Sequence, residues 1–329
     1  MNRRTFLASS AAVAMAVPTP DAKQTSLGVA TTSYMTARRF RDTLEFLEHC
    51  HKLGARGIQT ALTSLDRAYL DKVKARLHET GMYIEVMAAL PKVDMAQFLA
   101  TVDGAKHVGA HCIRAGALSG RRYETFATLD DWRKFVSDSK AAIARAVPVV
   151  ERARIPLALE NHKDWTVDEM VTLLKSYSSE YFGALLDTGN NISLLDDPME
   201  VVERLAPFAI STHIKDMGVA EYADGFLLSE VVIGEGFLNI PNIVSIIRKA
   251  RPKANMVLEM ITRDPLKVPV YTDKYWATFP DRSGIYMART LRMVRERKSK
   301  LPIFSNLSKE KQIEVEEDNV KRCLAALPA

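Results

Sequence analysis

The chain has 329 residues, of which 47% are hydrophobic, a formal net charge of +5 and three cysteines. The positive charges are spread along the chain, which argues against a nucleic-acid-binding protein, since such proteins concentrate Lys and Arg on one surface. The cysteines form no CxxC pair, so the sequence predicts no zinc ribbon.

The first residues have the composition of a targeting segment. Arg3 and Arg4 precede a short run of small apolar residues, and a small-x-small site follows at residues 14–16. The arginine pair resembles a twin-arginine signal. We therefore expect residues 1–16 to be a signal peptide and the protein to be periplasmic, or otherwise exported by that route. The apolar run is shorter than the roughly 20 residues of a membrane span, so we expect none in the mature protein.

Short apolar segments then alternate with amphipathic ones. Strands are expected at residues 27–31, 57–60, 83–88, 112–115, 156–160, 181–187, 209–213 and 255–259. Helices are expected at residues 40–53, 66–80, 95–108, 129–153, 167–176, 198–205, 240–250 and 283–297. Eight strand–helix units predict a single (β/α)8 TIM barrel over residues 27–297. An open doubly wound sheet is the alternative, but the first strand is not followed by a GxGxxG turn.

Three segments extend beyond the minimal barrel. Long loops follow strands seven and eight, at residues 214–238 and 260–282, on the face where barrel active sites lie. Ordered loops of this length are usually functional lids. The C-terminal tail, residues 298–329, is charged and predicted to be helical from Lys309. It is expected to pack on the barrel or on a partner subunit.

Four of the predicted strands end in a side chain that can bind metal. These residues are Glu160, Asp187, His213 and Glu259, which close strands five to eight. Each alone has an ordinary structural explanation, such as a salt bridge or a turn. Their shared position on successive parallel strands favours one site instead. Three carboxylates and an imidazole suit one divalent ion, and we expect Mn²⁺, with Mg²⁺, Co²⁺ or Zn²⁺ as alternatives.

This ordered set resembles the xylose-isomerase-like TIM-barrel superfamily, and is similar to its ketose 3-epimerases of the D-tagatose 3-epimerase type. The resemblance implies that Glu160, Asp187, His213 and Glu259 bind the metal, and that the two glutamates are also the acid/base pair. Three positions depart from the epimerase pattern, because Thr166, Asn190 and Val219 stand where those enzymes carry Glu, His and Arg. The substrate contacts therefore differ from those of known ketose 3-epimerases.

The residues favour a reaction at the carbon atom beside a carbonyl group, which is either epimerisation of that carbon or isomerisation of the sugar. Glu160 and Glu259 lie on opposite sides of the strand arc, so one can remove a proton and the other return it to the opposite face. The metal would stabilise the enediolate. Because each glutamate must serve as ligand and base, we expect a loosely held carboxylate. The expected enzyme is a metal-dependent sugar isomerase or epimerase.

Residues near the ligands are candidates for binding a sugar. The candidate substrate-binding residues are Asn161, His162, Asn190, Lys215, Arg114 and Trp276. Arg114 has an alternative role as the ion-pair partner of Glu85, and Trp276 an alternative role as an ordinary core or surface aromatic. Asp216 is expected to orient His213 or Lys215 as a second-shell group.

Three alternatives remain open. A keto-sugar dehydratase or lyase on the same fold would share the enediolate chemistry. An apurinic-site endonuclease would need more histidines than the seven present. A non-catalytic periplasmic sugar- or metal-binding protein is disfavoured by the paired glutamates. The expected partner is a small-molecule sugar and not a nucleic acid, and a homo-oligomer is left open.

Overall fold

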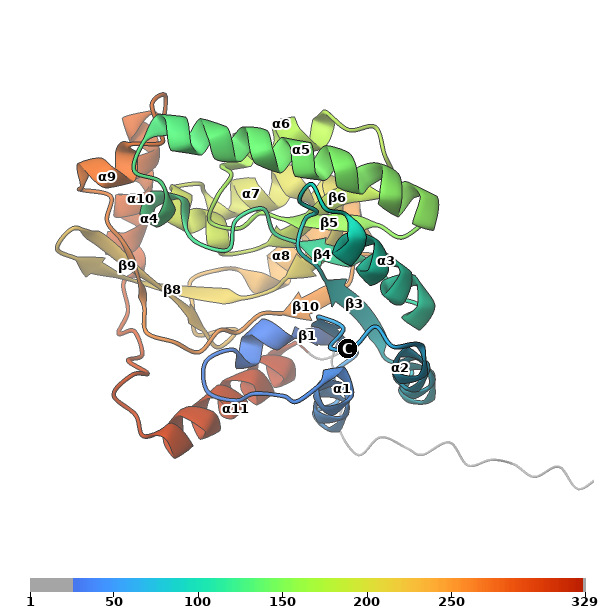
Figure 1. The fold of residues 1–329 in the computed structure, drawn as a ribbon. Helices are drawn as coiled ribbons and strands as arrows, with labels where there is room; N and C mark the ends of the chain where they lie inside the picture. The colour runs from blue at the N-terminus through green and yellow to red at the C-terminus, as the bar shows by residue number, and fades with distance from the viewer. Residues whose placement is uncertain (1–25, 328–329) are drawn as a thin grey trace, which may run out of the picture.

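Eight parallel strands form the centre of the structure, a computed structural model that describes residues 26–327 (Figure 1). The strands are β1 (Leu27–Ala30), β2 (Gly57–Thr60), β3 (Tyr83–Met87), β4 (Ile113–Ala115), β5 (Leu157–Glu160), β6 (Phe182–Asp187), β7 (Ala209–His213) and β10 (Met256–Leu258). They pair in the order β10-β1-β2-β3-β4-β5-β6-β7. Parallel bridges from Ser211 to Asn255 and from Ile214 to Leu258 join β7 to β10. The predicted (β/α)8 barrel is confirmed.

The barrel helices surround this sheet and begin and end at residues suited to those positions. They are α1 (Thr43–Lys52), α2 (Arg67–Thr80), α3 (Ala96–Val108), α5 (Leu129–Ala153), α6 (Val167–Lys175), α7 (Pro198–Leu205), α8 (Ile240–Ala250) and α10 (Gly284–Arg297). Asp42, Asp66 and Thr128 cap helix N-termini by accepting backbone N–H groups. Gly81 and Gly109 end α2 and α3 in the left-handed conformation that favours glycine.

Two glycines make room for an aromatic ring at the amino-terminal end of the barrel. A Cβ atom on Gly57 would lie 2.5 Å from the ring of Tyr83, and one on Gly28 would lie 2.2 Å from its hydroxyl oxygen. The Tyr83 hydroxyl donates to the carbonyl oxygen of Met256, 3.3 Å away on the far side of β1. The ring therefore packs across the amino-terminal ends of β1 and β2 and reaches β10.

The two long connections are mostly regular structure. The first contains the antiparallel hairpin of β8 (Asp216–Tyr222) and β9 (Gly225–Val231). The second contains β11 (Leu266–Val268), which pairs with β9, and the short helix α9 (Asp273–Trp276). The resulting three-stranded sheet projects beside the barrel (Figure 1). The two segments are ordered, as expected, but they contain a three-stranded sheet that was not predicted.

The remaining short elements are η1 (Thr31–Tyr34), α4 (Arg122–Thr125), η2 (Asn190–Leu194) and η3 (Ala206–Phe208). The tail forms α11 (Lys309–Ala326), as predicted from Lys309, and α11 lies beside the start of the chain at η1 (Figure 1). The signal peptide predicted at residues 1–16 lies outside the described residues. Among the helices of residues 26–327, none is both long and apolar enough to cross a membrane.

Candidate metal centre

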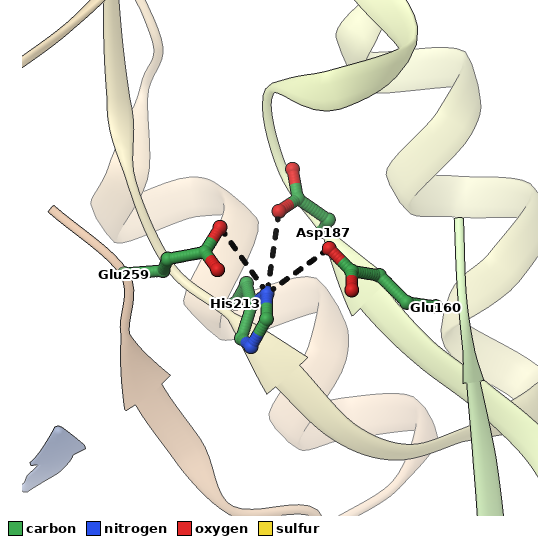
Figure 2. Close-up of side chains that lie close together, drawn as sticks. All are labelled: Glu160, Asp187, His213 and Glu259. Carbon is green, nitrogen blue, oxygen red and sulfur yellow. Dashed lines mark ion pairs between the residues drawn. The ribbon is translucent and has the colours of Figure 1, made fainter. Parts of the chain in front are cut away.

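The four predicted ligand residues meet at the carboxyl end of the barrel. Glu160 ends β5, Asp187 ends β6, His213 ends β7, and Glu259 follows β10. One ligand atom from each lies within 4.8 Å of the others, and all four side chains are buried. Figure 2 shows the three carboxylates around the Nδ1 atom of His213, which is 3.3 Å from Glu160 Oε1, 3.5 Å from Asp187 Oδ2 and 3.3 Å from Glu259 Oε2.

The donor atoms at the centre of this group fit a divalent ion. Asp187 Oδ1 accepts the backbone N–H groups of Gly189 and Asn190 at 2.9 and 2.8 Å, which turns Oδ2 toward His213. Asp187 Oδ2 and His213 Nδ1 are both buried. Asp187 Oδ2 forms an ion pair with Lys215 Nζ at 2.7 Å, but His213 Nδ1 has no hydrogen-bond partner within residues 26–327, and one bound cation would contact both atoms. The chemistry of the set matches Mn²⁺, Mg²⁺, Co²⁺ or Zn²⁺.

The electrostatics of the cluster favour a cation at the same point. Burial alone would raise the pKa of Glu160, but Arg114 and His213 hold it well below its usual value. Burial alone would lower the pKa of His213, but Glu259 and Glu160 raise it well above its usual value. Glu160 and Glu259, whose pKa values are both lowered, therefore remain ionised, and a proton or a metal ion at His213 Nδ1 is strongly stabilised.

A second polar group fixes the ring of His213. Gln59 Oε1 lies 2.7 Å from His213 Nε2, and Gln59 Nε2 donates to Glu85 Oε2 at 3.0 Å. Because an ionised carboxylate only accepts, the amide oxygen of Gln59 must face the imidazole. His213 Nε2 is then the donor, and Nδ1, once it has lost its proton, can offer its lone pair to a metal. Sequence reasoning missed Gln59 and considered Glu85 only as a partner of Arg114, although both are polar residues inside short buried strands.

Glu85 has its own complete set of partners. Ser211 Oγ donates to Oε2 at 2.6 Å, and Asn255 Nδ2 donates to Oε1 at 2.9 Å. We call Gln59, Glu85, Ser211 and Asn255 the Glu85 cluster. The alternative pairing of Arg114 with Glu85 is not formed. Arg114 instead makes an ion pair with Glu160, across β4 and β5.

Both glutamates of the metal centre are held firmly. Glu160 Oε1 accepts from Asn190 Nδ2 at 3.1 Å, while Oε2 accepts from Arg114. Glu259 Oε1 accepts from Thr32 Oγ1 at 2.8 Å, and Oε2 accepts from Lys215 Nζ. The structure therefore does not show the loosely held carboxylate that a residue serving as both ligand and base would suggest.

A cavity of about 630 Å³ opens over the centre and gives access to Glu160 and Glu259. Arg114 and His162, two of the predicted substrate-binding residues, line its wall. Lys163 and Arg263, which sequence reasoning did not select as binding residues, line it too. Cations on the wall and carboxylates on the floor suit a polar substrate.

Other predicted contacts lie behind this cavity. Asn161 exchanges hydrogen bonds with the backbone of Asp187, at 2.8 and 2.9 Å, and so supports the end of β6. Lys215 Nζ lies 2.7 Å from Asp187 Oδ2 and also pairs with Glu259, beneath the centre. Asn190 connects Glu160 with Lys163.

Two predicted site residues have structural partners instead. Trp276 is not part of the cavity wall, and its indole N–H donates to the carbonyl oxygen of Val270 at 2.8 Å. The carboxylate of Asp216 accepts backbone N–H groups and does not contact His213 or Lys215 among the described residues. Its donors are Met217, Gly234, Gly236 and Leu238. Asp216 therefore fixes the Gly-Glu-Gly turn, and the support of His213 comes from Gln59.

Comparison with known proteins agrees with this geometry. A family model described as the xylose isomerase-like TIM barrel matches residues 47–277. The 3-oxo-isoapionate decarboxylase of Pectobacterium atrosepticum is 25% identical over 201 residues, which are 60% of this chain and 69% of that protein.

Solved structures share the fold at low identity. The IOLI protein, whose structure contains a zinc atom, matches with a TM-score of 0.56 and 12% identity, over 92% of this chain and 98% of that one. The 3-keto-D-glucoside 4-epimerase YcjR of E. coli matches with a TM-score of 0.55 and 15% identity, over 83% of this chain and 100% of that one. The family match, which spans most of the barrel, shows that the chain belongs to the xylose isomerase-like TIM barrel family.

Proposed function

We propose that this protein is a divalent-metal-dependent sugar isomerase or epimerase that transfers a proton at a carbon beside a carbonyl group. The observation that carries the proposal is the placement of Glu160 and Glu259. Both line the same cavity, and they approach His213 Nδ1 from opposite sides (Figure 2). Two carboxylates so placed can act on the two faces of one carbon atom.

The protein's own residues prepare the site for this reaction. His213 Nδ1, Asp187 Oδ2 and the two glutamates would hold the ion, for which we propose Mn²⁺. When bound, the ion supplies polarisation of the carbonyl and stabilisation of the enediolate charge. Arg114 and Lys215 keep the glutamates ionised, because each donates to one of them. One glutamate then accepts the carbon-bound proton, and the other returns a proton to the opposite face.

The test is deuterium exchange with a panel of ketoses and 3-keto-sugars. The Mn²⁺-loaded protein would be incubated with each sugar in D₂O, and the carbon beside the carbonyl followed by NMR. We expect exchange with at least one sugar, and loss of exchange in Glu259→Gln while sugar binding is retained. The matched control is Glu235→Gln, because Glu235 is a half-exposed glutamate that pairs with Arg322. Unchanged exchange in Glu259→Gln would contradict the assigned role.

A lyase is the second candidate, because the relative from Pectobacterium is a decarboxylase. Loss of carbon dioxide or water beside a carbonyl also passes through an enolate, so the same carboxylates and metal ion would serve. Product analysis separates the two classes. An inverted or isomerised sugar of unchanged mass supports the isomerase, whereas a product lighter by water or carbon dioxide supports the lyase. Absence of exchange and of products across the panel, despite sugar binding, would favour a non-catalytic binding protein.

The cellular location belongs to the proposal as well. The arginine pair at Arg3 and Arg4 supports export by the twin-arginine route, which carries folded proteins. Fractionation of cells that produce the full chain tests this, with Arg3→Lys and Arg4→Lys combined as the comparison. Retention of that variant in the cytoplasm is expected, and equal export of both forms would contradict the route.

A further inference from the structure

One buried lysine in the cavity wall forms no ion pair with the residues that the structure describes. Lys163 lies three residues after Glu160, lines the cavity over the metal centre, and is only 3% exposed. Its Nζ atom donates to the amide oxygen of Asn190, which is neutral. Within residues 26–327, no carboxylate oxygen lies within 4.0 Å of Lys163 Nζ, so this lysine forms no ion pair there. A buried ammonium without such a partner is costly.

The other strong cations of this wall are neutralised. Arg114 pairs with Glu160, Arg121 with Glu124, and Arg263 with Glu230. The remaining carboxylate of the wall, Glu259, pairs with Lys215 beneath the centre. Lys163 is thus the cation of this cavity that the described residues leave uncompensated.

Among the described residues, the amide oxygen of Asn190 is the one hydrogen-bond acceptor that Lys163 has. Burial, and then repulsion by Lys215, lower the pKa of Lys163 to about 8. Two further buried nitrogen atoms on the same wall, Arg114 Nε and His162 Nδ1, make no hydrogen bond to the described residues. A bound oxygen anion would accept from the ammonium and raise its pKa again. Several unsatisfied polar atoms facing one cavity indicate a polar ligand.

Asn190 links this lysine directly to the metal centre. Its amide oxygen accepts from Lys163, while its Nδ2 atom donates to Glu160 Oε1 at 3.1 Å. An anionic group on Lys163 would therefore lie one side chain away from a proposed acid/base residue. That arrangement suits a compact molecule whose anionic group and carbonyl group are close together.

We propose that Lys163 binds a carboxylate group of the substrate, so that the substrate is a sugar acid rather than a neutral sugar. Lys163 is a single ammonium without an ion-pair partner among the described residues, and it therefore matches one negative charge. A phosphate, which carries up to two negative charges, is usually bound by several arginines or a row of backbone N–H groups. The inference rests on the proposed function only in taking this cavity as the substrate site.

Binding of matched sugar pairs tests the proposal. One pair is 2-keto-D-gluconate and D-fructose, and the other is D-glucuronate and D-glucose. The members of each pair differ by a carboxylate in place of a hydroxymethyl group. Calorimetric titration of the Mn²⁺-loaded protein is expected to show tighter binding of at least one acid, by about tenfold or more over its neutral partner, because a charged group forms the stronger hydrogen bonds.

Substitutions assign that preference to Lys163. Lys163→Met removes the charge at similar size and should abolish the preference, whereas Lys163→Arg should keep most of it. Lys134→Met, at an exposed lysine on α5, is the matched control and should bind like the unaltered protein. Mn²⁺ content and the thermal unfolding midpoint are measured for each variant. If Lys163→Met does not fold, Lys163→Gln takes its place.

Three outcomes would overturn the proposal. They are equal binding within both pairs, a preference for the acid that persists without the charge at position 163, and tighter binding of D-fructose 6-phosphate than of every acid. Failure of deuterium exchange would count against the proposed reaction, but it would leave a carboxylate preference intact. The binding test and the exchange test can therefore fail separately.

Discussion

The metal centre and the Glu85 cluster are two buried polar groups that meet at Gln59. They differ in how completely their polar atoms are hydrogen-bonded. Glu85 accepts hydrogen bonds on both carboxylate oxygens, from Gln59, Ser211 and Asn255. In the metal centre, His213 Nδ1 has no hydrogen-bond partner within the described chain, and Asp187 Oδ2 has only its ion pair with Lys215. A polar cluster with every atom satisfied contributes to the structure, whereas one with atoms left over is suited to bind something.

The largest expected effect concerns the metal centre. Asp187→Asn removes the charge of an oxygen atom that would bind the metal. Mn²⁺ affinity should fall by more than about a hundredfold, because loss of supporting residues alone typically costs ten- to a hundredfold. Equilibrium dialysis with metal analysis measures this. Asp168→Asn, at a surface aspartate paired with Arg204, is the control, and stoichiometric Mn²⁺ in Asp187→Asn would contradict the assignment.

The next largest effect concerns the Glu85 cluster. Glu85→Ala leaves the donors of Gln59, Ser211 and Asn255 without their acceptor. The free energy of unfolding of the metal-free protein should drop by about 3 kcal/mol. Urea unfolding followed by circular dichroism measures it. Glu79→Ala, at an exposed residue of α2, should change it little, and a similar small change in both variants would remove the distinction between the two clusters.

The residue that joins the clusters should affect binding more than stability. Gln59→Leu removes the acceptor of His213 Nε2, which frees the imidazole to rotate. We expect Mn²⁺ affinity to weaken by roughly ten- to a hundredfold. Gln97→Leu, on the exposed face of α3, is the comparison for titrations followed by metal competition. Unchanged affinity in Gln59→Leu would mean that His213 is oriented by other contacts.

Acidification should oppose metal binding. Against the effect of burial, Glu259 and Glu160 raise the folded-state pKa of His213 well above its usual value, so the metal-free protein holds a proton there at pH 7. Metal binding displaces this proton, and affinity should fall by about tenfold per pH unit below that pKa. A pH-stat titration with Mn²⁺ should record about one proton released per ion. No proton release at pH 7 would contradict this interpretation.

The raised pKa of His213 also predicts how the stability of the metal-free protein depends on pH. Because the folded-state pKa of His213 is raised, its contribution is fully present below the unfolded pKa near 6.5. The contribution is lost as pH rises from there through the folded pKa. Stability of the metal-free protein should therefore decline above about pH 6.5 from this group.

The smallest expected effect on stability concerns Glu316 of α11, in the C-terminal tail. Glu316 accepts the backbone N–H groups of Thr36, Ala37 and Arg38. Glu316→Gln replaces one acceptor oxygen by a donor, and we expect about 1–2 kcal/mol lower stability. Thermal unfolding measures this, with Glu314→Gln as the control, since Glu314 makes only an exposed ion pair with Lys311. Equal stability of the two variants would show that the tail does not support this segment.

Local sequence patterns predicted much of the fold. The helices at residues 129–153 and 240–250 form with the expected bounds, because their apolar spacing and caps lie within the segments themselves. The meeting of the four strand-end residues followed from the parallel barrel, in which strand ends share one face. The hairpin of β8 and β9 was missed, although Asp224-Gly225 is a turn signal between alternating strands.

The support of the site could not be predicted in this way. Gln59 reaches His213 across 154 positions of sequence, and Arg114 reaches Glu160 across 46. Such contacts depend on the closure of the barrel and on side-chain packing, neither of which leaves a periodic pattern. The isolation of Lys163 was equally hidden, because it rests on where every other charge finds its partner.

The contact of α11 with the first barrel loop has a consequence for the order of synthesis. Thr32, which donates to Glu259, lies just before the segment that Glu316 holds. The four proposed ligand residues leave the ribosome before residue 316 does. A nascent chain can therefore contain a complete set of ligands while the loop beside Glu259 still lacks its brace. The brace on this loop is therefore made after all four proposed ligand residues.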